Sequence, residues 1–277
     1  MTNAADWQGT VGKNWAQEWQ RTDTSFSELT PQLLAAISRE PGHRVVDVGC
    51  GAGELSLAIG HARPDALVTG IDISRDLIET ARSRSGPPNV TFEEADASVW
   101  RPGPGDAAPD LLVSRHGVMF FPDPPKAFGH LASVAAPRAR LVFSCFRTAA
   151  ENAWASGIAG LLPPTPPVRA QRFAPGPFAF ADPDHVAACL SGWRDLEFMP
   201  IDFGYIAGTG ADPVGEAMAL FRRIGPAASA LRTLPQEQRD EVETRLRELV
   251  EAHLADGRVR FPAAAWLVTA TFDHRDG

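Results

Sequence analysis

A short apolar strand that runs into closely spaced glycines is the first feature of this sequence that could do chemistry. The stretch VVDVGCGAGELSLA, residues 45–58, contains Gly49, Gly51 and Gly53. Glycine adopts positive φ without strain and lets a ligand approach the backbone closely. In a parallel sheet, such a loop lies at the carboxyl ends of the strands, where ligands bind. The loop is therefore a candidate ligand contact.

The next apolar strand ends in a carboxylate, Asp72, about 20 residues beyond the glycines. An acidic residue at that place can accept hydrogen bonds from ribose hydroxyls, which predicts a cofactor that contains a nucleoside. A dinucleotide fingerprint would need its third glycine at position 54, where this chain has Glu54. That carboxylate would repel a pyrophosphate, and the sequence lacks the GxxxxGK[ST] motif for a nucleoside triphosphate. The pattern favours a cationic cofactor without phosphates over a nicotinamide dinucleotide.

Two ionisable residues interrupt a later apolar run in the stretch VSRHGVMFF, residues 113–121. Arg115 and His116 follow a predicted strand at its carboxyl end, the same edge of the sheet as the glycine loop. Of the seven histidines, His116 alone has this position. Imidazole titrates near neutrality, so His116 is a candidate general base or substrate contact. A structural histidine that bonds a loop carbonyl is the alternative.

The elements that must position these residues alternate between strand and helix. This rhythm predicts an α/β fold with a mostly parallel sheet and helices on both faces. Strands are expected at 44–48, 66–74, 90–96, 110–114, 139–147, 195–205 and 263–272. Helices are expected at 12–20, 31–39, 53–63, 74–84, 124–135, 182–192, 213–224, 226–232 and 235–254.

Composition narrows the class of protein further. The chain has 277 residues, a hydrophobic fraction of 44% and a formal net charge of −8. An acidic balance gives no electrostatic footprint for nucleic acid or for an anionic membrane, so neither is expected as a partner. Three distant cysteines without a CxxC pair argue against disulfides and structural zinc. With no apparent signal peptide and no membrane span, the expected location is the cytoplasm.

The sequence resembles a known family. VVDVGCGAG is similar to the first motif of the class I S-adenosylmethionine-dependent methyltransferases, and residues 44–147 resemble their core. The resemblance is to the ubiquinone-biosynthesis-like, or type 11, methyltransferases in particular. GIDIS, EEADAS and the DLLVSRHGVMFF region follow in the family's order, and four motifs in order are more specific than a glycine loop alone.

The resemblance implies a set of cofactor contacts. Asp47 and the loop Gly49-Cys50-Gly51 would cradle the methionine part of S-adenosylmethionine, and Asp72 would hold the ribose. Ile73, Asp96 and Ala97 would lie against the adenine, and the backbone carbonyl of Ser114 would face the cofactor amino group. Arg115 could pair with the cofactor carboxylate or with an acidic neighbour such as Asp123. No metal is required.

The resemblance also implies a domain plan. We expect a Rossmann-like, seven-stranded sheet in one methyltransferase domain, 1–277, with a helical cap inserted before the last strand. Its expected segments are an N-terminal helical lid at 1–30, a cofactor-binding core at 31–148, a proline-rich lid segment at 149–180, the remaining core at 181–206 and 263–273, and a helical cap at 207–262.

The expected reaction is in-line transfer of a methyl group to a small, largely apolar acceptor, with release of S-adenosylhomocysteine. Six side chains are candidates for the lining of the acceptor pocket, with plain packing as the alternative for each: Met119, Phe120, Phe121, Phe173, Phe178 and Phe180. The alternatives are a relative that uses the cofactor for cyclisation or decarboxylation, and a cofactor-binding protein without catalysis. The sequence leaves open the acceptor's identity, the atom methylated, and whether the protein is a monomer or a homodimer.

Overall fold

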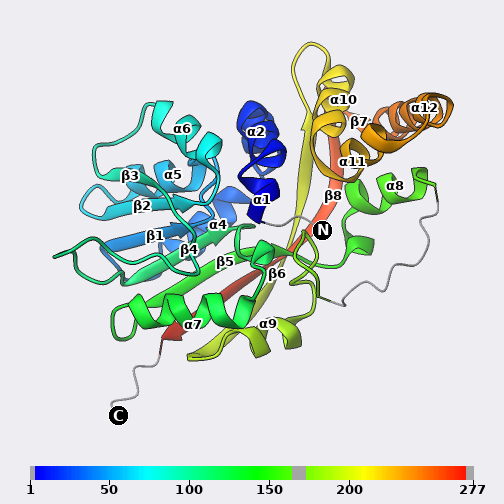
Figure 1. Cartoon of the computed structure of the whole chain (residues 1–277). Coiled ribbons are helices and arrows are strands. Elements are labelled where there is room, and N and C mark those ends of the chain that lie inside the picture. Colours follow the sequence, from blue (N-terminus) through cyan, green and yellow to red (C-terminus); the bar gives the residue numbers. More distant parts are fainter. Residues whose placement is uncertain (1–3, 164–172, 273–277) are drawn as a thin grey trace.

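A single mixed sheet forms the centre of the computed structural model, which describes residues 4–163 and 173–272 (Figure 1). The strand order is β3-β2-β1-β4-β5-β8-β6, and β7 pairs with β8. Strands β1 to β5 lie parallel, and β8 runs antiparallel between β5 and β6. The strands are β1 Arg44–Val48, β2 Leu67–Asp72, β3 Val90–Glu94, β4 Leu111–Arg115, β5 Arg140–Phe146, β6 Trp193–Gly208, β7 Leu254–Ala255 and β8 Arg258–Phe272. The predicted Rossmann-like, mostly parallel α/β sheet is confirmed, with the two-residue β7 added.

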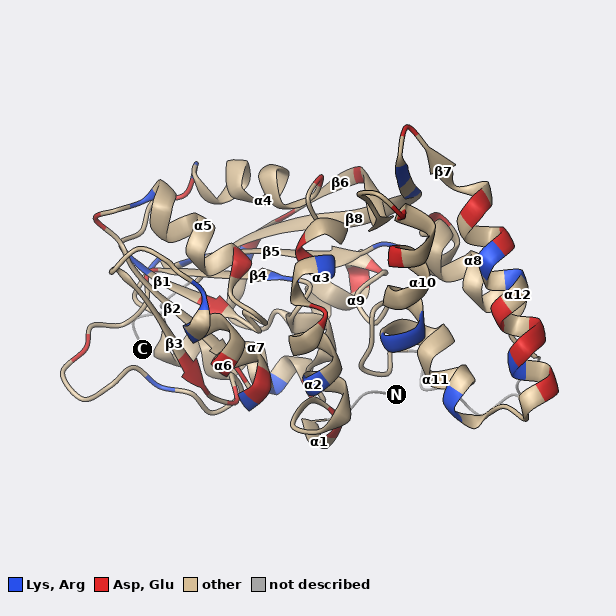
Figure 2. Cartoon of the chain, turned by 90° about the horizontal axis from the view of Figure 1, so that it is seen from above, with Lys and Arg blue, Asp and Glu red and all other residues tan. Residues whose placement is uncertain are grey.

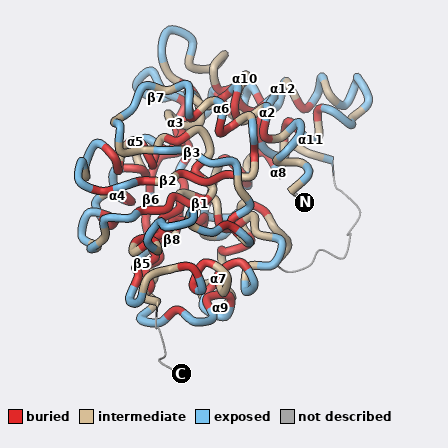
Figure 3. Tube along the Cα trace, turned by 60° about the vertical axis from the view of Figure 1, so that its left-hand side comes forward, coloured by how far each residue is buried: buried red, intermediate tan, exposed pale blue. Residues whose placement is uncertain are grey.

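Helices cover both faces of this sheet, as predicted: α4, α5 and α6 lie on one face and α7 and α9 on the other (Figure 1). The buried residues follow the strands (Figure 3). In β1, four of five residues are buried, as expected for a parallel strand covered on both faces. These helices are α4 Thr30–Ile37, α5 Glu54–Ala62, α6 Arg75–Ser83, α7 Pro124–Val134 and α9 Pro183–Cys189, with 3-10 turns at Val118–Phe120 and Ala149–Glu151.

The two antiparallel strands are longer than predicted. The expected strands covered 195–205 and 263–272, whereas β6 reaches Gly208 and β8 begins at Arg258. Their pairing continues from Trp193 opposite Phe272 to Gly208 opposite Val259. The added part is stabilised by helices outside the main sheet, because Phe261 is fully buried and contacts the ring of Phe221 in α10.

The cap is a group of helices at the far end of these long strands (Figure 1). In α12, Val242, Leu246 and Val250 are buried, and acidic and basic residues make up much of the rest of the helix (Figure 2). Helix α8 was not predicted: its run AWASGIAGL lacks charge, so it has no polar face that would mark it as an amphipathic helix. The cap helices are α8 Ala153–Leu161, α10 Pro213–Arg223, α11 Gly225–Thr233 and α12 Gln236–Ala252.

The N-terminal segment forms short helices rather than the predicted helix 12–20. Helix α2 ends at Gln17 and α3 begins at Trp19, so Trp15 and Trp19 belong to different helices. The break lies at Glu18, whose buried carboxylate pairs with Arg21 and with the cap. The three helices are α1 Ala4–Trp7, α2 Thr10–Gln17 and α3 Trp19–Ser25. Within residues 4–163 and 173–272, each helix is too short or too polar to span a lipid bilayer.

Asn152 fastens the beginning of α8 to β8, and its removal should loosen the cap. Its side chain is fully buried, donates to the carbonyls of Thr148 and Ala264, and accepts from the Ala264 N–H at 3.1 Å. Asn152→Ala leaves that buried N–H without a partner, which should lower the free energy of unfolding by about 2–3 kcal/mol. Urea denaturation measures this. Asn14→Ala is the control, because Asn14 makes one exposed bond and its loss should cost below about 0.5 kcal/mol. Equal effects of the two variants would contradict the prediction.

Candidate active site

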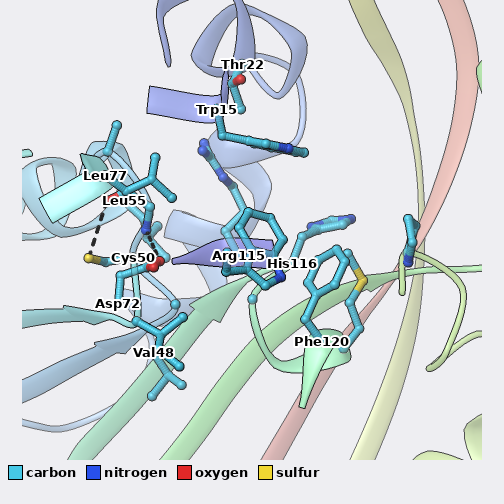
Figure 4. A pocket seen from close by; sticks show the side chains of 18 of the residues that line it. Trp15, Thr22, Val48, Cys50, Leu55, Asp72, Leu77, Arg115, His116 and Phe120 are labelled. Atoms are coloured by element: carbon cyan, nitrogen blue, oxygen red, sulfur yellow. Dashed lines mark hydrogen bonds between the residues drawn. The ribbon is translucent and has the colours of Figure 1, made fainter. Parts of the chain in front are cut away.

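A cavity lies at the carboxyl ends of β1, β2 and β4, beneath helices α1 to α3 (Figure 4). Its empty space, open mouth included, is ≈ 1720 Å³. In Figure 4, Cys50 and Asp72 lie on one side, His116 and Phe120 on the other, and Trp15 above. Of the ten predicted site residues, nine line the cavity: Asp47, Gly49, Cys50, Gly51, Asp72, Ile73, Asp96, Ala97 and His116.

The glycine loop is built by backbone contacts that exclude side chains. Gly49 has φ 67° and Gly51 has φ 57°, in the left-handed region that favours glycine. The N–H groups of Gly49 and Cys50 both donate to the carbonyl of Ile71. A Cβ at Gly49 would lie 2.9 Å from the Cα of Gly117, whereas a Cβ at Gly51 would meet nothing within 4 Å. Gly49 is therefore fixed by packing, and Gly51 has open space beside it.

This difference predicts unequal costs for two otherwise identical substitutions. Gly51→Ala should lower the free energy of unfolding by about 1–2 kcal/mol, the strain of positive φ. Gly49→Ala adds a backbone clash to that strain and should cost at least about 2 kcal/mol more. Thermal and urea unfolding of both variants measure the difference. Equal stability would mean that the close approach of Gly49 and Gly117 is not a constraint.

Asp72 both organises the loop and faces the cavity. Its carboxylate accepts from the N–H of Gly51 at 2.9 Å and from the N–H of Ser74 at 2.8 Å. Burial raises its pKa, and the two backbone donors oppose that rise. Each carboxylate oxygen can accept more than one hydrogen bond, so Asp72 has remaining capacity for ligand hydroxyls.

Asp47 is almost fully buried and only half satisfied. One carboxylate oxygen accepts from the Ser56 hydroxyl at 2.6 Å, and the other, Oδ1, is buried with no partner among the described residues. Burial raises the pKa of Asp47 to about 6, against the opposing hydrogen bond from Ser56. A buried carboxylate oxygen without a partner is uncommon, and a cationic ligand would satisfy it.

The remaining predicted contacts divide into two kinds. Asp96 is exposed at the rim of the cavity and accepts from the Ser98 N–H, while Ala97 beside it is buried. Ser114 does not line the cavity. It is fully buried, donates its hydroxyl to the carbonyl of Val48 and accepts from the Gly117 N–H, so it joins β4 to the glycine loop. Its proposed contact with a cofactor amino group stays a prediction.

Arg115 pairs with other acids than the one predicted. Its guanidinium forms an ion pair with Glu54, lies 3.9 Å from the Asp23 carboxylate, and donates to the Thr30 hydroxyl. Asp123, the predicted partner, instead caps α7. Because Asp23 belongs to α3, Arg115 connects the N-terminal helices to the sheet.

His116 is held rigidly in an uncommon conformation. It has φ 59°, is 6% exposed, and lies 4.1 Å from the Phe146 ring centroid. Its Nδ1 is 2.9 Å from the Ser144 hydroxyl, and its Nε2 is buried with no partner among the described residues. Burial, followed by the nearby charge of Arg115, lowers the pKa of His116 to about 3. The imidazole is therefore neutral near pH 7.

Aromatic side chains from several parts of the chain surround the His116 end. Met119, Phe120 and Phe121 line it as predicted. Phe173, Phe178 and Phe180 do not line it: Phe180 is fully buried in the core, and Phe178 packs on the lining residues Phe146 and Trp154. Sequence reasoning missed several lining residues on the lid, β5, the cap and β6: Trp7, Phe26, Phe146, Trp154, Tyr205, Phe221 and Ile224. Of these, only Trp7 had a signal in the sequence, because it belongs to a cluster of tryptophans near the N-terminus.

The charged residues that line the cavity are unbalanced. Among the described residues they are four carboxylates, Asp23, Asp47, Asp72 and Asp96, and one cation, Arg115, already paired with acids. This arrangement suits a cationic ligand and disfavours a polyanion. The described part of the chain holds no cluster of three or more metal-ligating side chains.

Comparison with known sequences identifies the central part of the chain. Residues 39–159 match a family described as a methyltransferase domain. A trans-aconitate 2-methyltransferase of Methylobacterium radiotolerans is 32% identical over 155 residues, covering 50% of this chain and 56% of that protein. Another, from Escherichia fergusonii, is 36% identical over 107 residues, covering 39% and 40%. The chain thus spans about half the length of the curated relatives that it matches.

Solved structures share the fold over more of the chain. A phosphoethanolamine N-methyltransferase of Haemonchus contortus, solved with S-adenosylmethionine, has a TM-score of 0.54 at 16% identity and covers 99% of this chain and 61% of that one. The YcgJ protein of Bacillus subtilis has a TM-score of 0.52 at 18% identity and covers 88% and 98%. At these identities the likeness concerns the fold alone.

Proposed function

The chain belongs to the class I S-adenosylmethionine-dependent methyltransferase superfamily, and from that premise we propose that it methylates a small, largely apolar acceptor. One observation carries the proposal: a single cavity has a carboxylate-lined end at the glycine loop and an aromatic end around His116. The first end suits a cationic nucleoside cofactor, and the second suits an apolar molecule beside it.

The residues at the first end fit S-adenosylmethionine. Asp72 would accept from the ribose hydroxyls, and the unpartnered oxygen of Asp47 would face the ammonium group of the methionine part. Ile73, Asp96 and Ala97 would lie along the adenine, and Cys50 and Gly51 would contribute backbone beside the methionine part. When bound, the cofactor supplies an electrophilic methyl group.

The aromatic end argues against trans-aconitate as the acceptor. A tricarboxylate needs cations to replace its lost hydration. The cavity's one described cation, Arg115, is already paired with Glu54 and Asp23. The curated relatives match only about half of the chain, which leaves room for a different acceptor site. We therefore expect a neutral acceptor.

His116 is our candidate for the residue that contacts the reacting atom of the acceptor. Its neutral imidazole can accept a hydrogen bond at Nε2 if Nδ1 donates to Ser144, and the aromatic rings around it exclude water. A rigid side chain that orients an acceptor in line with the methyl group is a main source of rate in such a displacement.

Binding and product analysis test the function directly. Calorimetry should show binding of S-adenosylmethionine and S-adenosylhomocysteine. Incubation with S-adenosylmethionine and a panel of neutral aromatic acceptors should yield S-adenosylhomocysteine and a product heavier by one methylene. Trans-aconitate should give no product. Failure to bind either cofactor form would overturn the proposal, and a product without added methylene would indicate the non-methylating alternative.

The raised pKa of Asp47 predicts that cofactor affinity depends on pH. Below about pH 6 the carboxyl is protonated in the free protein, so a cationic ligand must displace a proton. Affinity for S-adenosylmethionine should therefore be constant above about pH 6 and fall as the pH drops below it. Calorimetry across this range measures the change. Asp47→Asn should bind weakly and show a flatter profile, and an unchanged profile in this variant would assign the dependence to another group.

Substitution of His116 should separate turnover from cofactor binding. His116→Phe should lower turnover at least about tenfold, while S-adenosylmethionine affinity changes little. Because positive φ strains phenylalanine more than asparagine, His116→Asn tests the chemistry without that strain. His253→Phe is the matched control, since His253 stacks on Phe261 outside the cavity. Full turnover in both His116 variants would leave His116 a packing residue.

A further inference from the structure

Three ring nitrogens on the aromatic side of the cavity are buried and lack hydrogen-bond partners among the described residues: Nε1 of Trp7, Nε2 of His116 and Nε1 of Trp154. Trp7 packs on Trp15 and Phe120, while His116 and Trp154 share a different neighbour. The two side chains flank the same ring, because Phe146 lies 4.1 Å from His116 and 5.4 Å from Trp154 between centroids. Buried polar atoms without partners are uncommon and costly, so two in one wall call for a ligand that satisfies them.

Trp154 is held where it is by packing on several sides. Its indole stacks on Tyr205 at 5.3 Å and on Phe178 at 5.9 Å, and it is 7% exposed. It lies in the first turn of α8, two residues after the buried anchor Asn152. The indole N–H can only donate, so its partner must be an oxygen or another acceptor.

His116 complements this donor. The Ser144 hydroxyl fixes the ring through Nδ1, and Ser144 is fully buried in β5. With Nδ1 donating to Ser144, Nε2 is an acceptor and would face a hydroxyl proton. Beside Phe146 the wall thus offers one acceptor, His116, and one donor, Trp154. The indole N–H of Trp7, next to Phe120, is a second donor in the cavity, and Arg115, the one described cation that lines it, is already paired with acids.

We propose, on the basis of the function above, that His116 and Trp154 together select a neutral planar acceptor that carries a hydroxyl group and a second, hydrogen-bond-accepting oxygen. The hydroxyl donates to His116 and the second oxygen accepts from Trp154. The rings of Phe146, Tyr205 and Phe120 supply flat apolar contacts for such a molecule.

Bonds and charge both balance when the acceptor hydroxyl is the nucleophile and His116 accepts its proton. The hydroxyl oxygen forms the new bond to the methyl carbon, and the carbon–sulfur bond breaks with its electron pair kept on sulfur. The hydroxyl proton passes to Nε2 of His116 and then to solvent. The pocket loses the positive charge of the sulfonium as the imidazole gains one, so the net charge of the buried site does not change during the step.

The test compares matched ligands on the S-adenosylhomocysteine-loaded protein. The ligands are the ortho, meta and para isomers of hydroxybenzaldehyde, phenol without the second oxygen, and benzaldehyde without the hydroxyl. At least one hydroxybenzaldehyde isomer should bind more tightly than phenol and benzaldehyde, by about fivefold or more. The preferred isomer reports the spacing between the two ring nitrogens. The same ligands are then assayed for methylation with S-adenosylmethionine.

Trp154→Phe keeps an aromatic ring and removes the donor. It should erase the preference for hydroxybenzaldehyde over phenol and leave phenol binding and S-adenosylmethionine affinity within about twofold. Trp266→Phe is the control, because its indole N–H already donates to Ala181 and the residue is outside the cavity. Ser144→Ala should lower turnover more than it raises KM, and Ser144→Thr, which restores a hydroxyl, should recover part of it.

Several results would overturn the proposal. These are no binding by any hydroxybenzaldehyde isomer, equal binding of phenol and all isomers, or equal losses for phenol and hydroxybenzaldehyde in Trp154→Phe. Each of them leaves methyl transfer intact if S-adenosylmethionine still binds. Loss of cofactor binding in the wild-type protein would instead overturn the proposed function.

Discussion

The close approach of two backbone segments at Gly49 and Gly117 is the constraint on which the rest of the site depends. A side chain at either position would collide with the backbone of the other segment, since a Cβ at Gly117 would lie 2.6 Å from the carbonyl of Val48. Ser114 stabilises this contact, because its hydroxyl donates to the carbonyl of Val48 in one segment and accepts from the N–H of Gly117 in the other. The loop with Asp47 and the turn with His116 therefore keep one fixed separation, which in-line transfer between two ligands requires.

A buried charge arrangement extends this rigidity to the N-terminal helices. Arg115, one residue before His116, contacts Glu54 of α5 and Asp23 of α3. Asp23 also pairs with Arg84 at 2.9 Å. Burial raises the pKa of Asp23 while both arginines oppose the rise. Removing one member would leave the others buried without compensation. The acids and arginines therefore act together to hold the N-terminal helices over the cavity.

The cofactor half of this site was predictable because local sequence specifies it. A loop that needs positive φ shows its glycines, and a strand end shows its carboxylate, so Gly49 and Asp72 could be named from spacing alone and Asp47 from the family resemblance. The aromatic end was predictable only in part: His116, Met119, Phe120 and Phe121 directly follow a strand and could be named, but residues on distant segments could not. Trp154 and Tyr205 reach the cavity through tertiary packing of segments that are 51 residues apart in the chain, and no local pattern distinguishes them from core residues. The same reason explains the errors at Phe178 and Phe180.

The unusual length of β6 and β8 has a consequence for how such a protein can diversify. The cap is carried on a long ladder of backbone pairing, from Trp193 opposite Phe272 to Gly208 opposite Val259, with register shifts between Arg194 and Glu197 and between Ile206 and Gly208. Backbone pairing is indifferent to most side chains, so helices α8 and α10 to α12 can exchange residues without disturbing their support. Tyr205 belongs to β6, one of these two long strands, whereas the glycine loop follows β1. The part of acceptor preference that we assign to Trp154 and Tyr205 can therefore change without altering the glycine loop, whereas the part that we assign to His116 stays fixed beside that loop at the end of β4.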